Sequence, residues 1–435
     1  MGSYLNFINE FRLLDTKKIG FIFFYLGIFF LPSALFFSLI FLLISFLINN
    51  FYLKRLLLKD KWNIPFILSG FFMIISTIFH LFIVESSSNG NWDPILSVIG
   101  LSNWLPFFWI FWSVQPYVRS INDRKKVAWI LISGTFPVLI SGICQYFFNI
   151  TGPFSIFNGL IIWYQRPIVD PAGLSSLFNN PNYAGAWLSI VFPFCIASFM
   201  DRNNQNFKRF ITILFLILVG ICLLLTNSRI AWGNLLLSIP FVLGASSFLY
   251  LIPLLILLTL IIVWTTNPLL TGVIQDQLRT LIPNKIWMEF STEGFEGQDV
   301  SRLGIWISAI KFIAKRPLIG FGAASFPILF EIQSSFWKGH THNLFLEIAV
   351  SYGIPASIII FCTIFLLLFI SGREIYLVNH DKSLLDHYYE KAWWTSILLL
   401  LISQQVDVHY FDARISICFW ILLGGLRNII AKENI

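Results

Sequence analysis

The residues best suited to chemistry lie in one polar stretch of an otherwise apolar chain, between positions 302 and 356. Within it, the tetrapeptide His-Thr-His-Asn at 340–343 comes directly before a long apolar segment, which places the imidazole of His342 at a helix N-terminus. The positive end of the helix dipole disfavours an imidazolium, and a neutral imidazole can take the proton of a hydroxyl group. We therefore interpret His342 as a general base. The plainer interpretation is that it only caps the helix.

A metal site is a further possibility, because His340 and His342 have the spacing His-x-His. Zinc takes four ligands in structural sites and three protein ligands in catalytic sites. The sequence offers no nearby cysteine and no obvious cluster of carboxylates to complete such a set. We therefore predict that these histidines hold no metal. As a separate expectation, the protein uses no cofactor.

Basic residues accompany these histidines: Arg302, Lys315, Arg316 and Lys338 gather several positive charges. Residues 302–315 fit an amphipathic helix that a proline terminates. Its predicted apolar face consists of Leu303, Trp306, Ile307, Ile310, Ile313 and Ala314. We expect the helix to lie in the membrane interface with this face down; alternatively, it only seals the top of a helix bundle.

Several polar residues outside this stretch could contribute to the same site. Arg229 stands between two apolar spans with almost no loop, so it either reaches the headgroups or points into a cavity that holds an anion such as phosphate. Asn182 follows Asn180-Pro181 at the start of another span, where helix capping is the plainer role. A last group could line the cavity or form a simple interfacial cluster: Gln404, Gln405, Asp407 and His409, with Asp412 and Arg414.

The elements that must position these residues are membrane helices. Of 435 residues, 57% are hydrophobic and 12% are charged, about half the charged share of a soluble domain. A span needs about 20 apolar residues, and an open sheet cannot satisfy its backbone in lipid. The sequence predicts an all-α, polytopic membrane protein with a large outer loop that carries the amphipathic helix. The twelve expected spans are 20–32, 34–53, 63–84, 95–117, 127–149, 182–200, 210–226, 230–246, 248–264, 343–370, 393–410 and 415–430.

The positions of the basic residues set the expected orientation. Most Lys and Arg residues fall on one side if the first apolar stretch is broken at 31–33, and the short loops of the other side hold just Arg166, Arg229 and Arg414. Because cytoplasmic loops are rich in Lys and Arg, we expect both termini to be cytoplasmic. The expected organisation is one membrane domain: nine helices in 1–264, a periplasmic loop at 265–341, and three helices in 342–435.

Four motifs, taken in order, resemble those of the bacterial O-antigen ligase and polymerase superfamily. They are Asn180-Pro181-Asn182, Ser228-Arg229, Arg302 with Trp306 followed by RPLIGFG at 316–322, and His342-Asn343 separated by nine residues from Gly353. The chain departs from the family's ligase pattern at Ala356. The family also often has an arginine a few residues before Asn-Pro-Asn, and here the nearest one is Arg166. The motifs cover about 130–360.

This resemblance implies that a glycan is transferred from an undecaprenyl-diphosphate carrier to an acceptor hydroxyl, on the periplasmic face of the bacterial inner membrane. A ligase of the family uses the lipid A core as acceptor, and a polymerase uses another lipid-linked repeat. We predict a ligase of lipopolysaccharide biosynthesis, because of the spacing from His342-Asn343 to Gly353, with a polymerase as the alternative. The expected partners are the lipid-linked glycan, the acceptor glycan and membrane lipids, with no nucleic acid.

The resemblance also suggests roles for the residues. Arg229 and Arg302 would hold the diphosphate, whose charge grows in the transition state. Arg316 and Lys338 would support them, and His342 would accept or orient the acceptor hydroxyl. The remaining expected substrate-binding residues are His340, Asn343, Asn182 and Arg166.

Two rival classes are a membrane transporter and a non-catalytic scaffold. A transporter should have discontinuous helices in matching halves and polar groups at the midplane. In this sequence the polar groups concentrate near one surface instead. A scaffold would leave the placement of the arginines and histidines unexplained.

Overall fold

The computed structural model describes residues 2–53, 57–82, 93–169, 172–201, 206–267, 272–281, 302–378 and 384–431. These parts of the chain are nearly all helical, with one short antiparallel pair of strands, β1 (Phe154–Ile156) and β2 (Ile161–Trp163). The first half contains α1 (Gly2–Phe30), α2 (Leu35–Leu53), α3 (Ile64–Phe82), α4 (Ile95–Leu101), α5 (Leu105–Val114), α6 (Ile121–Gly134), α7 (Phe136–Phe148) and α8 (Pro181–Met200). The second half contains α9 (Asn206–Leu225), α10 (Arg229–Leu243), α11 (Phe248–Thr266), α12 (Val273–Leu281), α14 (Arg302–Lys315), α15 (Phe326–Ser334), α16 (Leu344–Tyr352), α17 (Ile354–Arg373), α18 (Leu384–Ser403) and α19 (Ala413–Ile430).

Short helical turns join several of these helices. They are the 3₁₀ turns η1 (Leu57–Lys59), η2 (Lys61–Asn63), η3 (Gln115–Val118) and η4 (Ala245–Ser247), and the π turn η6 (Glu374–Val378).

Seven helical segments of the described chain are long and apolar enough to cross a membrane. They are Lys61–Leu81, Ile95–Val118, Ile121–Phe148, Pro181–Met200, Phe207–Leu225, Ile354–Val378 and Ala413–Ile430. Helical residues lie in each of the twelve expected spans. However, several of these helices are short, such as α10, or contain charged residues near their start, such as α18. The membrane helices are therefore confirmed as a class, and the count of twelve stays a prediction.

The expected break in the first apolar stretch is confirmed. α1 ends at Phe30 and α2 begins at Leu35, with turns in between. The hydroxyl of Ser38 donates to the carbonyl of Gly27 at 2.7 Å, and a Cβ on Gly27 would lie 2.6 Å from the side chain of Leu42. The two helices therefore pack closely as a hairpin, and Gly27 permits the close approach.

The expected single span over 343–370 is wrong, because it is divided into α16 and α17 at Gly353. The turn at 316–322 packs against this division through its backbone, and the amide of Phe321 donates to the carbonyl of Val350 at 2.7 Å. A Cβ on Gly353 would lie 2.2 Å from the carbonyl oxygen of Leu318, and one on Gly320 would lie 2.5 Å from that of Val350. Both glycines also have positive φ, of 89° and 63°. They permit the turn and the helix break to meet.

The expected boundary of the eleventh span is also wrong, because α18 ends at Ser403 instead of continuing to 410. The residues that follow form a loop over 404–412 that bonds to the start of α16. The amide of Leu344 donates to the carbonyl of Gln404 at 2.8 Å. Tertiary hydrogen bonds thus replace the next helical turn and bring the polar loop to the segment that contains His342.

The amphipathic helix has its expected bounds as α14, but the expected face is only partly right. Its buried residues are Ile305, Ser308, Ala309, Phe312 and Ile313. By contrast, Leu303, Ile307 and Ile310 of the predicted apolar face are 64%, 45% and 56% exposed. The small side chain of Ala309 belongs to the apolar cluster that α14 shares with α16, so the helix turns this side inward and leaves a second apolar stripe outside.

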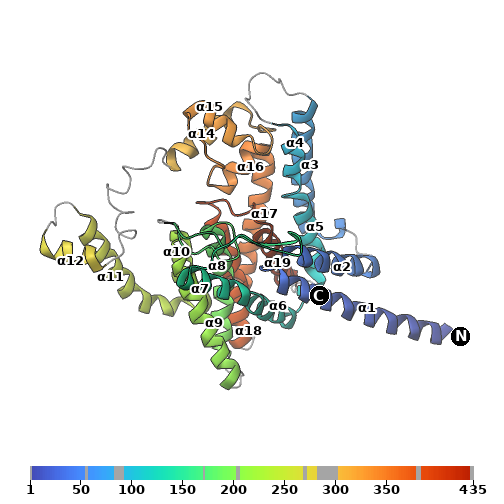
Figure 1. Ribbon diagram of the computed structural model, residues 1–435. Coiled ribbons are helices and arrows are strands. Elements are labelled where there is room, and N and C mark those ends of the chain that lie inside the picture. The colour runs from blue at the N-terminus through green and yellow to red at the C-terminus, as the bar shows by residue number, and fades with distance from the viewer. Residues whose placement is uncertain are drawn as a thin grey trace.

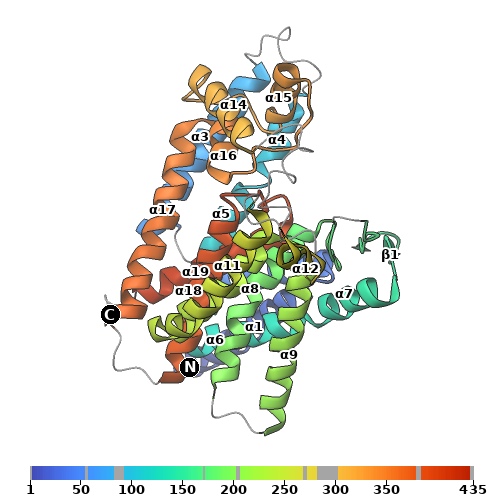
Figure 2. The ribbon, with the colours of Figure 1, turned by 90° about the vertical axis from the view of Figure 1, so that its left-hand side faces the viewer.

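The helices form a bundle around α8, α18 and α19, with a smaller layer at one end (Figures 1 and 2). The middle of α8 is buried from Ala184 to Ser198, as expected for a helix surrounded by others. The end layer, which we call the capping layer, consists of α14, α15 and α16 and lies beside α3 and α4 (Figure 1). The loops at 340–343 and 404–412 meet between the bundle and this layer, where α16 begins.

Candidate functional site

Asn343 fixes the loop that contains the two histidines. Its Oδ1 accepts a hydrogen bond from the amide of Leu346 at 3.0 Å, which makes it the N-cap of α16. Its Nδ2 donates to the carbonyl of Gln405 at 3.0 Å. Both ends of the amide are therefore used within the protein, so Asn343 acts as a positioning residue for the segment before it.

The backbone on either side of His342 is held as well. The amide of the buried Thr341 donates to Oε2 of Glu347 at 2.9 Å. His342 itself has a φ of 54°, in the left-handed region that residues with a Cβ seldom adopt. Surrounding contacts must stabilise such a conformation, and strained residues of this kind cluster at functional sites. The imidazole of His342 faces the loop that follows α18, where it contacts Asp407.

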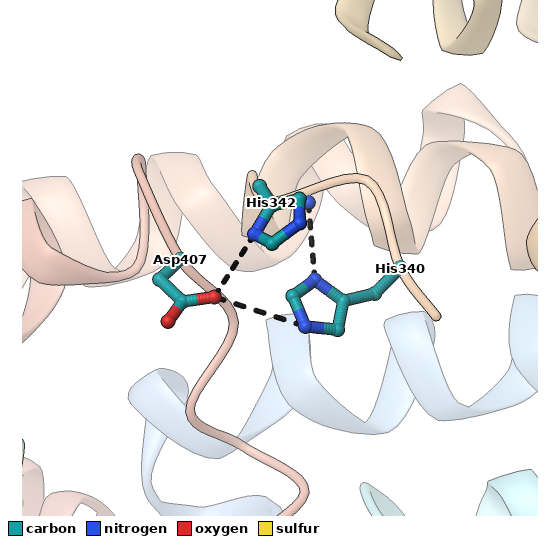
Figure 3. Close-up of side chains that lie close together, drawn as sticks. All are labelled: His340, His342 and Asp407. Carbon is teal, nitrogen blue, oxygen red and sulfur yellow. Dashed lines mark hydrogen bonds and ion pairs between the residues drawn. The ribbon is translucent and has the colours of Figure 1, made fainter. Parts of the chain in front are cut away.

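Asp407 is the centre of the site (Figure 3). One carboxylate oxygen, Oδ1, lies 3.1 Å from Nδ1 of His342 and accepts the amide of Val408 at 2.9 Å. The other oxygen, Oδ2, accepts Nδ2 of Asn182 at 2.8 Å. His340 is next to this pair, with its Nε2 at 3.7 Å from Oδ1. Residues from α8 and from two loops thus converge on one carboxylate.

These contacts determine where the proton of His342 lies. An ionised carboxylate only accepts hydrogen bonds, so Nδ1 of His342, at 3.1 Å from Asp407, must carry the proton. In the neutral ring, Nε2 then has a free lone pair. The side chain of His342 is 27% exposed, so an incoming molecule can reach the ring. The arrangement is that of a general base oriented by a carboxylate.

The same reasoning bears on the metal question, because the ligand atoms of His340, His342 and Asp407 all lie within 4.8 Å of one another. From the sequence, Asp407 is only one of several polar residues that could line the cavity, and the structure brings its carboxylate to the two histidines. The amide of His342 donates to Nδ1 of His340 at 3.2 Å. In neutral His340 the proton therefore lies on Nε2, the atom that faces Asp407, where a metal would need a lone pair. The hydrogen bonds fit a metal-free cluster better than a metal site.

Burial and charge set the protonation of the cluster. Burial alone would raise the pKa of Asp407, but the hydrogen bond from His342 and the charges of the nearby histidines hold this pKa well below its usual value. Burial, helped by the charge of His342, lowers the pKa of His340 to about 4, although Asp407 opposes the shift. Burial also lowers the pKa of His409. At neutral pH the cluster therefore contains an ionised Asp407 beside a neutral His340.

Comparison with known proteins shows that the segment containing His340 and His342 matches a known family. Residues 213–361 match the family model of O-antigen ligase. The match confirms the resemblance to the O-antigen ligase superfamily, and it supports a function in lipid-linked glycan transfer at a membrane. A search of curated proteins finds no match to the chain.

The O-antigen ligase match includes both of the arginines expected to be catalytic. Arg302 is the exposed first residue of α14, and its charge is among those that lower the pKa of His340. Arg229 is the exposed first residue of α10. The first turn of α10 packs on α8, since a Cβ on Gly185 would lie 2.9 Å from Ala231. The structure thus places Arg302 within electrostatic reach of the cluster, and Arg229 at the end of the bundle where Asn182 lies.

The other basic residues expected at the site, Arg316, Lys338 and Arg166, have less connection to the cluster. The guanidinium of Arg316 lies 4.8 Å from the centre of the Phe321 ring, and its buried Nη1 has no hydrogen-bond partner among the described residues. Lys338 is half-buried two residues before His340. Arg166 is exposed, and its backbone is fixed in the loop after β2 by Gln145 and Ser175. The structure places none of these three side chains against Asp407.

Sequence reasoning missed the central position of Asp407, which lies beyond the O-antigen ligase match. It was expected only as one of several polar residues that could line a cavity. The same holds for His409, which is fully buried with Nε2 at 4.0 Å from Oδ2 of Asp407. The available signal was a carboxylate and a histidine two residues apart, next to a long apolar segment. In such a setting an ionisable pair needs partners.

Proposed function

We propose that the protein transfers a glycan from a polyprenyl-diphosphate carrier to an acceptor hydroxyl, most specifically as an O-antigen ligase. The observation that carries this proposal is the hydrogen bond between His342 and Asp407, which leaves a basic nitrogen on His342. Arg302 lies within electrostatic reach of the neighbouring His340. The match of 213–361 to the O-antigen ligase family supports the choice of a lipid-linked donor. Undecaprenyl diphosphate as the carrier and the lipid A core as the acceptor rest on the resemblance alone.

In the proposed reaction, Nε2 of His342 takes the proton of the acceptor hydroxyl. The hydroxyl oxygen then attacks the anomeric carbon of the glycan in line, and the bond between this carbon and the diphosphate breaks. The electron pair leaves with the lipid diphosphate, so the configuration at the anomeric carbon is inverted. Asp407 stabilises the imidazolium that forms on His342, as an adjacent carboxylate does for other histidine bases.

The arginines act on the leaving group. Negative charge on the lipid diphosphate grows as the bond breaks, and positioned guanidinium groups stabilise such charge in the transition state. Arg302 and Arg229 are proposed for this role, because both are exposed. Arg229 begins α10 at the end of the bundle where Asn182 lies, and the charge of Arg302 reaches the cluster from the capping layer. Arg316 and Lys338 are proposed only to support the two arginines in holding the diphosphate, because neither side chain contacts the cluster. Arg166 would take part only if its exposed side chain bends toward a bound ligand.

A purified-protein assay tests the proposal. The wild-type protein, reconstituted with lipid-linked O-antigen and a lipid A core acceptor, should form the coupled product and release the lipid diphosphate. His342→Gln should reduce both by about 10²–10⁴-fold, the usual contribution of a positioned general base. His387→Gln, which alters a histidine near the other end of α18, is the matched control. Equal rates for wild type and His342→Gln would remove the base from the mechanism.

A polymerase is the alternative within the same chemistry, and surface glycan separates the two. A strain that lacks the gene should have uncapped core and accumulated lipid-linked polymer if the protein is a ligase. Core that bears a single repeat would identify a polymerase instead. Normal glycan together with a transport defect would favour the transporter hypothesis and overturn the proposal.

A further inference from the structure

A second site lies near the end of α18 opposite the cluster of His340, His342 and Asp407, which we call the His–Asp cluster. A cleft of about 700 Å³ opens between α1, α6 and α9, and it is lined by Tyr25, Asn122, Lys125, Lys126, Trp129, Ile130, Lys208 and Ile211. Its Lys125 lies over the ring of Tyr389, near the start of α18, whereas Asp407 follows the end of that helix. α18 rises roughly 20 Å between the two positions, so the cleft is separate from the proposed reaction site.

The cleft has an excess of positive charge. Lys125 is held by Asp201, with Nζ at 3.3 Å from the carboxylate oxygen. Lys126 and Lys208 are exposed, and neither has an ion-pair partner among the described residues. Asp123, the remaining carboxylate on this stretch of α6, is engaged with Ser120 in a capping box. Two lysines therefore remain to bind an anion at the mouth of the cleft.

The walls of the cleft are apolar, and they continue into a surface suited to hydrocarbon. Trp129, Ile130 and Ile211 line the cleft beneath the lysines. α9 then carries a stripe of exposed apolar side chains along its length: Phe207, Phe210, Leu214, Ile217 and Ile221. Just 22% of the spanning window of α9 is buried, so most of this helix faces its surroundings, and a chain that leaves the cleft meets a continuous apolar face.

We propose that this cleft binds an anionic phospholipid of the membrane. Its phosphate would lie between Lys126 and Lys208, and an acyl chain would follow the apolar stripe of α9. Basic pockets between membrane helices on the cytoplasmic side bind such headgroups, and long lysine side chains reach from apolar surfaces to charged ones. A soluble anion would make no contact with the apolar walls. A zwitterionic lipid has no net negative charge, so it would leave the positive charge of the two lysines uncompensated. α6 and the start of α9 lie in the part of the molecule away from the capping layer (Figures 1 and 2), as expected for the other leaflet.

Native mass spectrometry of the full chain, released from mixed micelles of equal phosphatidylglycerol and phosphatidylcholine, tests the proposal. The wild-type protein should retain phosphatidylglycerol preferentially. Lys126→Gln/Lys208→Gln should weaken this retention about 30-fold, equivalent to about 2 kcal/mol, since each lysine near an anionic headgroup contributes about 1 kcal/mol. Ile211→Asp, which adds a carboxylate to the cleft and leaves the lysines in place, should weaken it as well.

The matched control is Lys59→Gln/Lys61→Gln, which removes two exposed lysines outside the cleft and should leave retention unchanged. Equal retention of both lipids, or an unchanged preference in Lys126→Gln/Lys208→Gln, would overturn the proposal. Displacement of the lipid by inorganic phosphate would show a soluble-anion site instead. A dimer that the double variant converts to monomer would show that a second copy of the chain occupies the cleft.

Discussion

The His–Asp cluster and the basic residues around it are organised in opposite ways. Within the cluster, each carboxylate oxygen of Asp407 accepts a hydrogen bond, and the loop before α16 is fixed at several points. Arg229 and Arg302 instead begin their helices as exposed residues. A base must hold one tautomer and one orientation before the acceptor arrives. Groups that hold a diphosphate must admit it and release it again, which requires side chains that solvent and ligand can reach.

This difference predicts that substitutions in the cluster reduce the transfer rate more than substitutions of the basic residues around it. Asp407→Asn keeps the shape of the side chain but removes the charge that holds the proton on Nδ1 of His342. We expect the transfer rate to fall by about 10²–10⁴-fold, with the protein still folded. The measurement is product formation under saturating donor, with thermal unfolding as the check on folding. Glu331→Gln, at an exposed carboxylate of α15, is the control; a similar loss in both variants would contradict the assignment.

The next largest effect should separate two arginines of the same segment. Arg302→Ala removes an exposed cation near His340, so we expect a rate loss of about 10–100-fold without a change in thermal stability, as for one charge-assisted contact. Arg316→Ala removes packing over Phe321, so it should lower stability more than rate. Transfer assays and thermal unfolding of both variants provide the test. The reverse pattern would move the diphosphate site toward Arg316.

A smaller effect concerns stability against pH. The pKa of His340 is about 4 in the folded protein and near 6.5 in the unfolded chain. Between these values the unfolded state binds the extra proton, so folding stability decreases as pH falls from about 6.5 toward 4. At pH 5 the loss is on the order of 2 kcal/mol. Asp407, whose pKa is lowered, keeps its contribution until the pH falls below the usual range of a carboxyl group.

His340→Gln should therefore lose less stability than the wild type between pH 7 and pH 5. Thermal unfolding in one detergent across this range measures the two slopes. The comparison uses slopes, because the substitution also removes the acceptor of the His342 amide. Parallel slopes would show that His340 is not the residue responsible.

Features that depend on neighbouring residues could be predicted from the sequence. Features that depend on contacts between distant residues could not. The break at 31–33 and the bounds of α14 follow from proline, charge and helical periodicity. By contrast, Asp407 and His342 are 65 residues apart, and no local pattern pairs them. The inward face of α14 could not be chosen either, because the helix has apolar residues on two sides and its packing on α16 selects one of them.

The smallest effects should distinguish residues that hold the loop from residues that act on the carboxylate. Asn343→Ala removes the N-cap of α16 and should cost about 1 kcal/mol of stability. Asn343→Asp retains an oxygen for the cap but loses the donor to the carbonyl of Gln405. If Asn343 acts by tethering the loop, the aspartate variant should regain most of the stability and little of the rate.

Asn182→Ala, which removes a donor to Asp407, should show a fewfold loss of rate with little change in unfolding. If Asn182→Ala lowers stability and Asn343→Ala does not, then Asn182 holds the structure and Asn343 does not, which would contradict the assignment.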